Sequence, residues 1–296
     1  MNATPRPFAL FSGAAHCCGV AGLFLLAVVL SACEPASKQP PQNQAATQTE
    51  IQKPRRGLRA PPTGTPYSLE YFEPTADNPA YGTLMVNDHA FLVPEGVTRP
   101  SVQSVYLLSH WKINPGESVL DMGTGSGVQA IFAAEISQHI VATDISPKAV
   151  ETARLNVKRF GLQDRIEVRL GDLFAPIKSG ERFDVILFNI DYPSNQYTQF
   201  WWKIHERFFD EVRQYLKPNG RIYYQIGLVD NVPRVKAMAD RNGLRIMSMR
   251  MDERLIFQRA PIVFMLQREE DVQEQLRRED AAYLRQVETD KRRAAP

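Results

Sequence analysis

The sequence has 296 residues, of which 44% are hydrophobic and 23% are charged. This composition excludes a collagen-like, a fully disordered or a polytopic membrane protein. The formal net charge is +2, but the first 66 residues hold six basic and two acidic side chains, so the remaining 230 residues carry a formal charge of −2. A body with this balance disfavours tight, non-specific binding to nucleic acid.

The first 33 residues contain all three cysteines, Cys17, Cys18 and Cys33. Residues 17–33 are apolar apart from one serine, which predicts a signal or a membrane segment. The string LSAC at 30–33 resembles a bacterial lipobox, in which Cys33 is lipidated and becomes the mature N-terminus. The alternative is an uncleaved anchor, because the stretch with its flanks approaches the roughly 20 residues that span a bilayer. We expect a bacterial, membrane-anchored protein, with an exported lipoprotein favoured over a body that faces the cytoplasm.

Residues 34–66 contain seven prolines and almost no large apolar side chain, which predicts a disordered tether. Residues 67–267 then form one predicted domain, and 268–296 form a charged C-terminal helix. That helix carries a thin apolar stripe at Val272, Leu276, Tyr283 and Val287. The stripe favours a solvated helix lying on the domain, with a partner-binding helix as the alternative.

The domain begins with a predicted hairpin over 83–93 and a helix over 102–111. From residue 118 onward, apolar runs alternate with helical patterns. Strands are expected at 118–122, 140–143, 166–170, 183–189, 221–226, 244–251 and 262–266, with helices at 127–136, 147–160, 200–216 and 232–241. This alternation predicts an α/β fold, a Rossmann-like, doubly wound and mostly parallel seven-stranded sheet with helices on both faces. Such sheets bind ligands at the carboxyl ends of their strands.

A glycine-rich turn follows the strand over 118–122. The acid Asp121 precedes Gly123, Gly125 and Gly127, and the turn opens a helix. Glycine lets the backbone approach a ligand, and a helix start presents free N–H donors. A dinucleotide-binding fingerprint needs a glycine at position 128, where this chain has Val128, so the turn disfavours a nicotinamide nucleotide.

Three further strand ends carry polar residues. Asp144 ends the next strand 23 residues after Asp121, and a carboxylate there can accept both hydroxyls of a ribose. The third cluster holds Asp172 and Leu173, and the fourth begins at Asn189. The predicted cofactor-binding residues are Asp121, Gly123, Gly125, Gly127, Asp144, Ile145, Asp172, Leu173 and Asn189. No metal site is predicted, because the domain lacks cysteine and its histidines show no ligand spacing.

These clusters resemble a known family. The strings DMGTGSG, TDISPKAVETARLNV, GDLF and FDVILFN are similar to the methyltransferase small-domain group of class I S-adenosylmethionine-dependent methyltransferases, which includes release-factor glutamine and ribosomal-RNA guanine methyltransferases. The resemblance spans roughly 83–267. It implies S-adenosylmethionine as the cofactor, with Asp121 near its methionine amino group, Gly123 and Gly125 beneath it, Asp144 on its ribose, and Asp172 with Leu173 beside its adenine.

The fourth cluster departs from the family, which has Asn-Pro-Pro-Tyr where this chain has Asn189, Ile190, Asp191 and Tyr192. The resemblance implies that Asn189 binds the nitrogen to be methylated and that Tyr192 stacks on the acceptor. Ile190 still offers a carbonyl, and Asp191 adds an anion that can orient or deprotonate a nucleophile. The predicted catalytic residues are Asn189, Asp191 and Tyr192.

The sequence therefore predicts an S-adenosylmethionine-dependent methyltransferase that acts on a nitrogen or oxygen nucleophile of a small-molecule or protein acceptor. The alternative is a membrane-anchored lipoprotein that uses the same fold as a non-catalytic binding module. A second expectation concerns the aromatic residues over 200–209. Their helical spacing favours packing in the core over stacking on a substrate.

Overall fold

The computed structural model describes residues 67–192, 196–251 and 260–294. The expected signal, Cys33 and the tether over 34–66 lie outside the described residues. Within those residues, no helix combines the length and the apolar character needed to cross a membrane.

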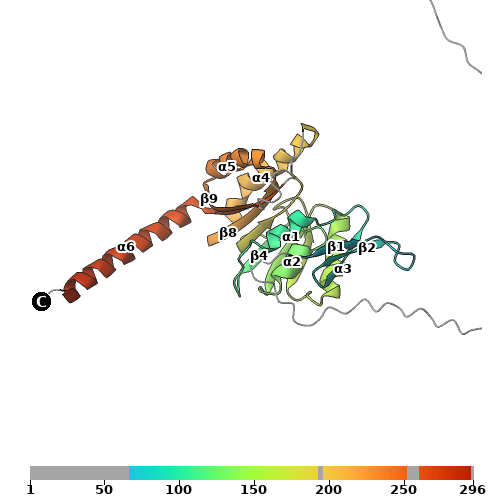
Figure 1. The fold of residues 1–296 in the computed structure, drawn as a ribbon, viewed down its shortest axis with the longest axis horizontal. Helices are drawn as coiled ribbons and strands as arrows, with labels where there is room; N and C mark the ends of the chain where they lie inside the picture. Colours follow the sequence, from blue (N-terminus) through green and yellow to red (C-terminus); the bar gives the residue numbers. More distant parts are fainter. Residues whose placement is uncertain (1–66, 193–195, 252–259, 295–296) are drawn as a thin grey trace, which may run out of the picture. The chain divides into compact units, whose positions relative to one another are not determined.

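The structure contains two β-sheets and six α-helices in its described part (Figure 1). The strands are β1 (Leu69–Phe72), β2 (Tyr81–Val86), β3 (His89–Pro94), β4 (Ser118–Met122), β5 (His139–Asp144), β6 (Ile166–Leu170), β7 (Phe183–Phe188), β8 (Leu216–Gly227), β9 (Leu244–Met251) and β10 (Pro261–Arg268). The helices are α1 (Val102–Leu108), α2 (Val128–Ala133), α3 (Pro147–Arg159), α4 (Trp202–Val212), α5 (Val232–Arg241) and α6 (Glu269–Ala294).

The larger sheet has the strand order β6-β5-β4-β7-β8-β10-β9. The pairs from β6 to β8 are parallel, and β10 pairs antiparallel with both β8 and β9. This arrangement confirms the predicted doubly wound, mostly parallel seven-stranded sheet. From β4 the chain adds β5 and then β6 on one side, and it then crosses to β7 on the other side of β4. The strand order therefore reverses between β4 and β7, at their carboxyl ends.

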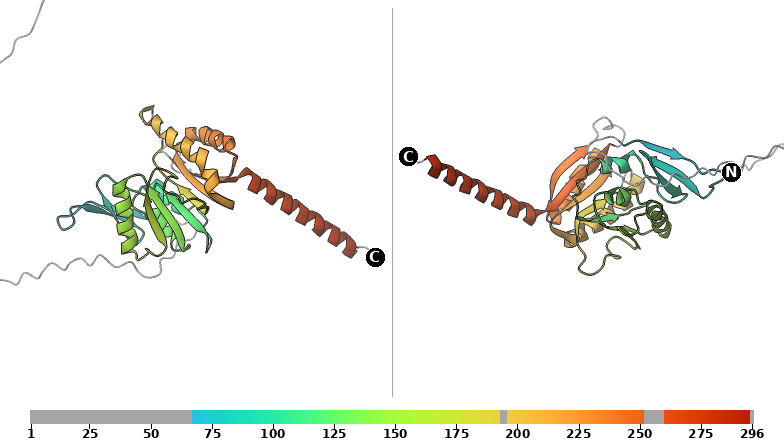
Figure 2. Two further views of the ribbon diagram at one scale, coloured as in Figure 1. Left: turned by 180° about the vertical axis from the view of Figure 1, so that it is seen from behind. Right: turned by 90° about the horizontal axis from the view of Figure 1, so that it is seen from below.

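Alternation along the central strands divides the core between the two faces of this sheet. Val119 belongs to a cluster with α1, α2, α3 and the small sheet, whereas its neighbour Leu120 packs with α4 and α5. The same parity holds in β7, where Val185 and Ile186 belong to opposite clusters. Successive side chains of a strand point to opposite faces, so each central strand contributes side chains to the hydrophobic core on both faces of the sheet. Figure 2 shows the two layers of helices from further directions.

The smaller sheet has the order β1-β2-β3 and is antiparallel throughout. The predicted hairpin corresponds to β2 and β3, which turn at Asn87 with φ of 54°. The sequence pattern did not predict β1. The amide Nδ2 of Asn156 on α3 donates to Leu92 O at 2.9 Å and to Ser126 O at 2.8 Å, which ties the small sheet to the glycine turn.

The segment around residue 200 differs from its prediction. A 3₁₀ helix over Gln196–Trp201 precedes α4, which begins at Trp202. Trp202, Phe208 and Phe209 are buried, as expected, but Phe200 is 57% exposed. The prediction that all these aromatic residues pack in the core is therefore wrong for Phe200, because the tighter 3₁₀ turn places it on a different face from the α-helical spacing.

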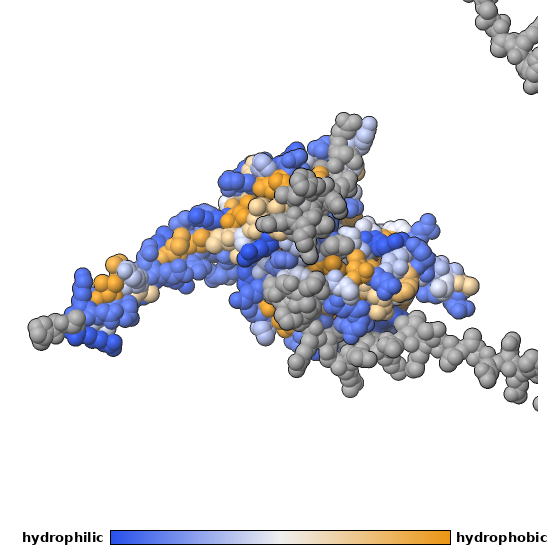
Figure 3. All heavy atoms as spheres, in the orientation of Figure 1, coloured by the Kyte–Doolittle hydropathy of each residue, from blue (hydrophilic) through white to orange (hydrophobic). Residues whose placement is uncertain are grey.

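The C-terminal helix α6 contacts the sheet through its first turn. Arg213 pairs with Glu270 at 2.8 Å, and Asp271 accepts a hydrogen bond from Asn219 N at 2.9 Å. Val272 is buried, but Leu276 is 45% exposed and Tyr283 is 69% exposed. Only the beginning of the expected stripe packs on the domain, and Figure 3 shows apolar surface along the rest of α6.

Candidate active site

A cavity of about 390 Å³ lies at the carboxyl ends of β4, β5 and β7. It is bordered by the segment before α1, by α1 itself, by the loop after β6 and by the start of α4. The predicted site residues that line it are Gly123, Gly125, Asp144, Ile145, Asp172, Leu173, Asn189, Asp191 and Tyr192. Asp121 and Gly127 do not line it. The structure thus brings nine of the eleven predicted site residues to one cavity.

The glycine turn is held against β5 by backbone hydrogen bonds. The N–H groups of Gly123 and Thr124 donate to Thr143 O at 2.8 and 2.9 Å. Gly123 and Gly125 have φ of 74° and 57°, in the left-handed region that favours glycine. A Cβ on Gly123 would lie 2.2 Å from Cγ2 of Ile190, whereas a Cβ on Gly125 would meet no atom within 4 Å. Any side chain on Gly125 would therefore occupy the cavity.

Asp121 lies beneath this turn and not beside the cavity. Its carboxylate Oδ2 accepts hydrogen bonds from Thr124 Oγ1 at 2.6 Å and from Ala130 N at 3.1 Å. The residue is 3% exposed, and burial raises the pKa of Asp121 to about 7. These contacts link the turn to α2, so the carboxylate positions the turn. The implied contact with the methionine amino group stays a prediction.

The raised pKa of Asp121 gives a testable dependence of stability on pH. The folded protein keeps a proton on this carboxyl up to about pH 7, whereas the unfolded chain releases it near pH 3.8. The unfolding free energy therefore falls as the pH rises from 4 to 7, by at most about 4 kcal/mol from this group. Asp121→Asn removes the titration, so urea denaturation should show the variant gaining stability relative to the wild type across this window. Parallel pH profiles would contradict the buried, raised-pKa carboxyl.

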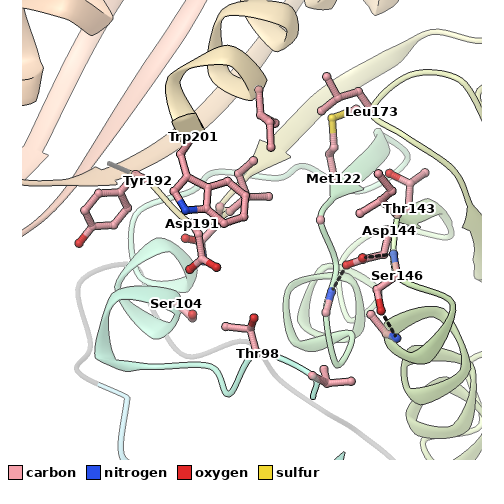
Figure 4. A pocket seen from close by; sticks show the side chains of 18 of the residues that line it. Thr98, Ser104, Met122, Thr143, Asp144, Ser146, Leu173, Asp191, Tyr192 and Trp201 are labelled. Carbon is pink, nitrogen blue, oxygen red and sulfur yellow. Dashed lines mark hydrogen bonds between the residues drawn. The ribbon is translucent and has the colours of Figure 1, made fainter. Parts of the chain in front are cut away.

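Asp144 connects the glycine turn to α3. Its Oδ2 accepts from Gly125 N at 2.9 Å, and its Oδ1 accepts from Ser146 N at 2.9 Å (Figure 4). A carboxylate has about four acceptor positions, so both oxygens can still accept hydroxyl donors from the cavity. Ile145, directly after it, is 67% exposed and lines the same wall.

The third cluster closes the other end of this wall. Asp172 pairs with Arg207 of α4 at 2.8 Å, and both side chains are about half exposed. Leu173 is buried and adopts φ of 46°. A Cβ on Gly171 would lie 2.7 Å from Cδ of Pro176, so this loop approaches itself closely. Leu173 therefore gives this part of the cavity wall an apolar surface, beside the Asp172 carboxylate that pairs with Arg207.

The fourth cluster, Asn189 to Tyr192, follows β7 and lies across the cavity from Asp144. Tyr192 donates its hydroxyl proton to Gln103 Oε1 of α1 at 2.9 Å. A Cβ on Gly227 would lie 2.0 Å from the Tyr192 hydroxyl, so the ring occupies space that only glycine leaves free. Desolvation raises the pKa of the Asp191 carboxyl, although the residue remains accessible.

His205 of α4 supports this cluster, and no role in the site was predicted for it. Its Nε2 lies 3.0 Å from the carbonyl oxygen of Asp191, and its Nδ1 lies 2.6 Å from the Tyr224 hydroxyl. A carbonyl only accepts, so Nε2 carries the proton and Tyr224 donates to Nδ1. Burial lowers the pKa of His205 to about 4, which keeps the ring neutral. The buried ring fixes the backbone at Asp191.

We expect His205→Phe to disturb the fourth cluster. The variant leaves the Asp191 carbonyl without its donor and the buried Tyr224 hydroxyl without its acceptor, which should lower the unfolding free energy by about 1–3 kcal/mol. Turnover should fall while the affinity for the expected cofactor, S-adenosylmethionine, stays constant, as measured by steady-state kinetics and equilibrium dialysis. Tyr224→Phe is the control, because it keeps the Nε2–H donor to Asp191. Equal turnover in both variants would show that His205 does not position the cluster.

Trp201 is a second lining residue that the sequence did not assign to the site. Figure 4 shows its indole directly beside the Asp191 carboxylate, with the Tyr192 ring next to them. The prediction that Trp201 packs in the core is therefore corrected, since its side chain forms part of the cavity wall. Within the described parts of the chain, no group of three His, Cys, Asp or Glu side chains could hold a metal ion.

The sequence of this chain is similar to those of known methyltransferases. Residues 99–235 match a family model described as the methyltransferase small domain. A release factor glutamine methyltransferase from Koribacter versatilis is 29% identical over 203 residues, which cover 61% of this chain and 71% of that protein. A ribosomal protein L11 methyltransferase from Geobacillus thermodenitrificans is 38% identical over 110 residues, which cover 37% of this chain and 31% of that protein.

The fold is shared with a crystal structure of a tRNA methyltransferase from M. jannaschii. The TM-score is 0.50 at 16% identity, and the match covers 64% of this chain and 56% of that one. Together, the family model and the named relatives support an S-adenosylmethionine-dependent methyltransferase of the class I fold. Two features of the cavity fit that cofactor. The space above Gly125 leaves room for a nucleoside, and both carboxylate oxygens of Asp144 can accept hydrogen bonds from ribose hydroxyls.

Proposed function

We propose that this S-adenosylmethionine-dependent methyltransferase transfers a methyl group to a nitrogen or oxygen nucleophile of a protein acceptor. One observation carries the proposal, namely that the wall formed by Gly125 and Asp144 and the cluster from Asn189 to Tyr192 line the same cavity. A cofactor wall and an acceptor wall that face each other can hold two reactants at reacting distance. Holding them so removes most of the entropic barrier to a bimolecular transfer.

The cofactor half of the cavity would use four features of the chain. The Asp144 carboxylate accepts hydrogen bonds from the ribose hydroxyls. Gly123 and Gly125 leave room for the cofactor above their backbone, and the side chain of Leu173 packs against the adenine. When bound, the cofactor supplies a sulfonium methyl group. Asp121 contributes indirectly, because its carboxylate holds the turn that carries the two glycines.

The acceptor half consists of the fourth cluster and its supports. Asn189 offers a side-chain oxygen that accepts a hydrogen bond from the nucleophile and so aims its lone pair. Tyr192, held by Gln103, packs against the acceptor. Asp191 accepts a hydrogen bond or a proton from the nucleophile. Methyl transfer needs little further acid or base assistance once the nucleophile and the methyl group are aligned.

A protein acceptor is supported by the relatives named for release factors and for ribosomal protein L11. The expectation that nucleic acid is disfavoured rested on the net charge of the body, and no comparison supports it. No finding favours the alternative of a non-catalytic binding module. We therefore retain the enzyme and treat protein as the acceptor to be tested first.

The experiment uses the full chain, methyl-labelled S-adenosylmethionine and a bacterial extract depleted of small molecules. After the reaction, parallel samples are digested with protease or with ribonuclease, and the label that stays in large molecules is counted. We expect protease to release the label and ribonuclease to leave it. Ribonuclease-sensitive label would replace protein by RNA as the acceptor, and binding of the cofactor without any transfer would favour the non-catalytic module.

The proposal includes attachment to a membrane through residues 1–33, either by a lipidated Cys33 or by an uncleaved anchor. The support is the apolar stretch that ends in LSAC. Metabolic labelling with a fatty acid distinguishes the two, since Cys33→Ser abolishes the label only if that cysteine is acylated. A reporter fused to the C-terminus then gives the side of the membrane on which the body lies.

A further inference from the structure

Two buried glutamines outside the cavity hold the helix α1. Gln225 of β8 is 1% exposed and Gln129 of α2 is 6% exposed. The Nε2 of Gln225 donates to Gln103 O at 2.6 Å, and the Nε2 of Gln129 donates to Ser104 O at 3.1 Å. A backbone carbonyl only accepts, so each amide turns its nitrogen toward α1. Two consecutive carbonyls of α1 are therefore bonded to side chains from two other elements.

The position of α1 sets one wall of the cavity. Ser101, Gln103 and Ser104 line the cavity, and Val105 and Leu108 of the same helix are buried in the hydrophobic core. The helix has seven residues, and a helix of that length depends on tertiary contacts for its stability. Apolar packing is non-directional, so the hydrogen bonds to its backbone carbonyls define where α1 lies along and around its axis.

Gln103 connects Gln225 to the fourth cluster. Its backbone carbonyl accepts from Gln225, and its side-chain Oε1 accepts from the Tyr192 hydroxyl at 2.9 Å. The same strand, β8, also meets Tyr192 directly, because Gly227 leaves free the space beside that hydroxyl. Gln225 and Gly227 are two residues apart, so both positions face the side of the sheet on which α1 lies. The Tyr192 ring is therefore located by β8 at two points.

An amide at position 225 is unfavourable for stability alone. Val263, its partner on β10, and Tyr223, on the same face of β8, are both buried in the hydrophobic core. The Oε1 of Gln225 is buried and has no hydrogen-bond partner among the described residues. A buried polar atom without a partner costs free energy, which a methionine of similar length would avoid. What this side chain contributes beyond an apolar one is therefore its bond to Gln103 O.

We propose that Gln225 is a positioning residue for methyl transfer, which acts through Gln103 to hold Tyr192 in place for the acceptor. This inference rests on the proposed function, in which Tyr192 packs against the acceptor. Gln225 does not touch the reactants, since it is not among the described residues that line the cavity. When Gln225 is replaced, α1 keeps its bond to Gln129, so the helix stays docked while Gln103 shifts.

Gln225→Met tests the proposal in the full chain. Label from methyl-labelled S-adenosylmethionine at saturating concentration is counted in the large molecules of a bacterial extract, and equilibrium dialysis gives the cofactor affinity. We expect transfer to fall about tenfold, because the Tyr192 ring loses its fixed position, while the affinity stays within about twofold. The Tm should equal or exceed that of the wild type, which separates positioning from a structural role.

The matched control is Gln267→Met. The Nε2 of Gln267 also donates to a backbone carbonyl, Asn219 O at 3.4 Å, but this residue is not among the described residues that line the cavity or contact α1 through a hydrogen bond. This variant should keep the wild-type rate. A rate for Gln225→Met within about twofold of the control would overturn the proposal, as would a fall in Tm that accounts for the lost rate.

A double-mutant cycle shows whether Gln225 acts through Tyr192. Tyr192→Phe removes the hydroxyl that donates to Gln103, so adding Gln225→Met to that background should lower transfer less than about twofold further. A further loss of about tenfold would show that Gln225 acts by another route and would overturn the proposal. If Gln225→Met does not fold, Gln225→Asn replaces it, because its amide is one methylene too short to reach Gln103 O, and the same outcomes apply.

Fluorine NMR of the chain labelled with meta-fluorotyrosine tests the hold on Tyr192 without any acceptor. The Tyr192 resonance is the one missing from Tyr192→Phe, and we expect it to shift or broaden in Gln225→Met but not in Gln267→Met. An unchanged resonance in Gln225→Met would overturn the proposal. A wild type that neither binds S-adenosylmethionine nor transfers its methyl group would instead refute the proposed function, and the resonance would still show whether Gln225 holds Tyr192.

Discussion

Asn189→Ala should lower kcat by about 100-fold, because a nucleophile that loses its positioning acceptor spends little time aligned with the methyl group. Asn189 directly follows β7, which flanks the point where the strand order reverses, and it lines the cavity beside Asp191. Among the hydrogen bonds of the described residues that hold the glycine turn, none involves Asn189. The affinity for S-adenosylmethionine should therefore stay within about twofold of the wild type, a change of less than 0.5 kcal/mol on the usual scale.

The measurement pairs single-turnover rates with equilibrium dialysis of labelled cofactor. Asn114→Ala is the matched control, because Asn114 is bonded to Glu117 ahead of β4 and does not line the cavity. That variant should keep the wild-type rate. A rate for Asn189→Ala within twofold of the control would remove Asn189 from the catalytic group.

Gly125→Leu should abolish detectable cofactor binding. A Cβ at this position would meet no atom within 4 Å, so the leucine side chain would extend into the cavity beside Asp144, where the nucleoside is expected. The φ of 57° also strains a residue with a Cβ, which costs on the order of 1–2 kcal/mol of stability. Thermal unfolding should therefore show a modestly lowered Tm together with the complete loss of affinity.

Gly116→Leu separates these two effects. Gly116 has φ of 85°, and a Cβ there also meets no atom within 4 Å, but the residue lies ahead of β4 and does not line the cavity. This variant should lose similar stability and keep its affinity for the cofactor. Equal affinities in both glycine variants would show that the cavity above Gly125 is not the cofactor site.

The strand ends were predictable from sequence because parallel strands place their carboxyl ends at one edge of the sheet. That rule brought Asp144, Asp172 and Asn189 to a common cavity without any knowledge of side-chain packing. It does not say which face of a strand each acid occupies. Asp121 lies two residues after Val119 in β4, so both side chains point to the same face of the sheet, the face that α2 covers. This alternation is the sequence signal that could have placed the Asp121 carboxylate beneath the turn.

His205 and Trp201 could not be assigned from sequence for a different reason. Both lie on the segment that follows the fourth cluster, and their roles depend on where that segment returns to the sheet. The helical spacing of the aromatic residues indicated one buried face, but the 3₁₀ turn before α4 rotates Trp201 out of it. The partner of His205, Tyr224, comes from β8, a contact between elements that local spacing does not encode.

A crystal structure of the full chain with S-adenosylhomocysteine tests the central claim most directly. We predict that both ribose hydroxyls lie within hydrogen-bond distance of the Asp144 carboxylate, that the amino acid part passes over Gly123 and Gly125, and that the sulfur faces Asn189. A nucleoside bound elsewhere, or a cavity that stays empty at millimolar ligand, would contradict the account.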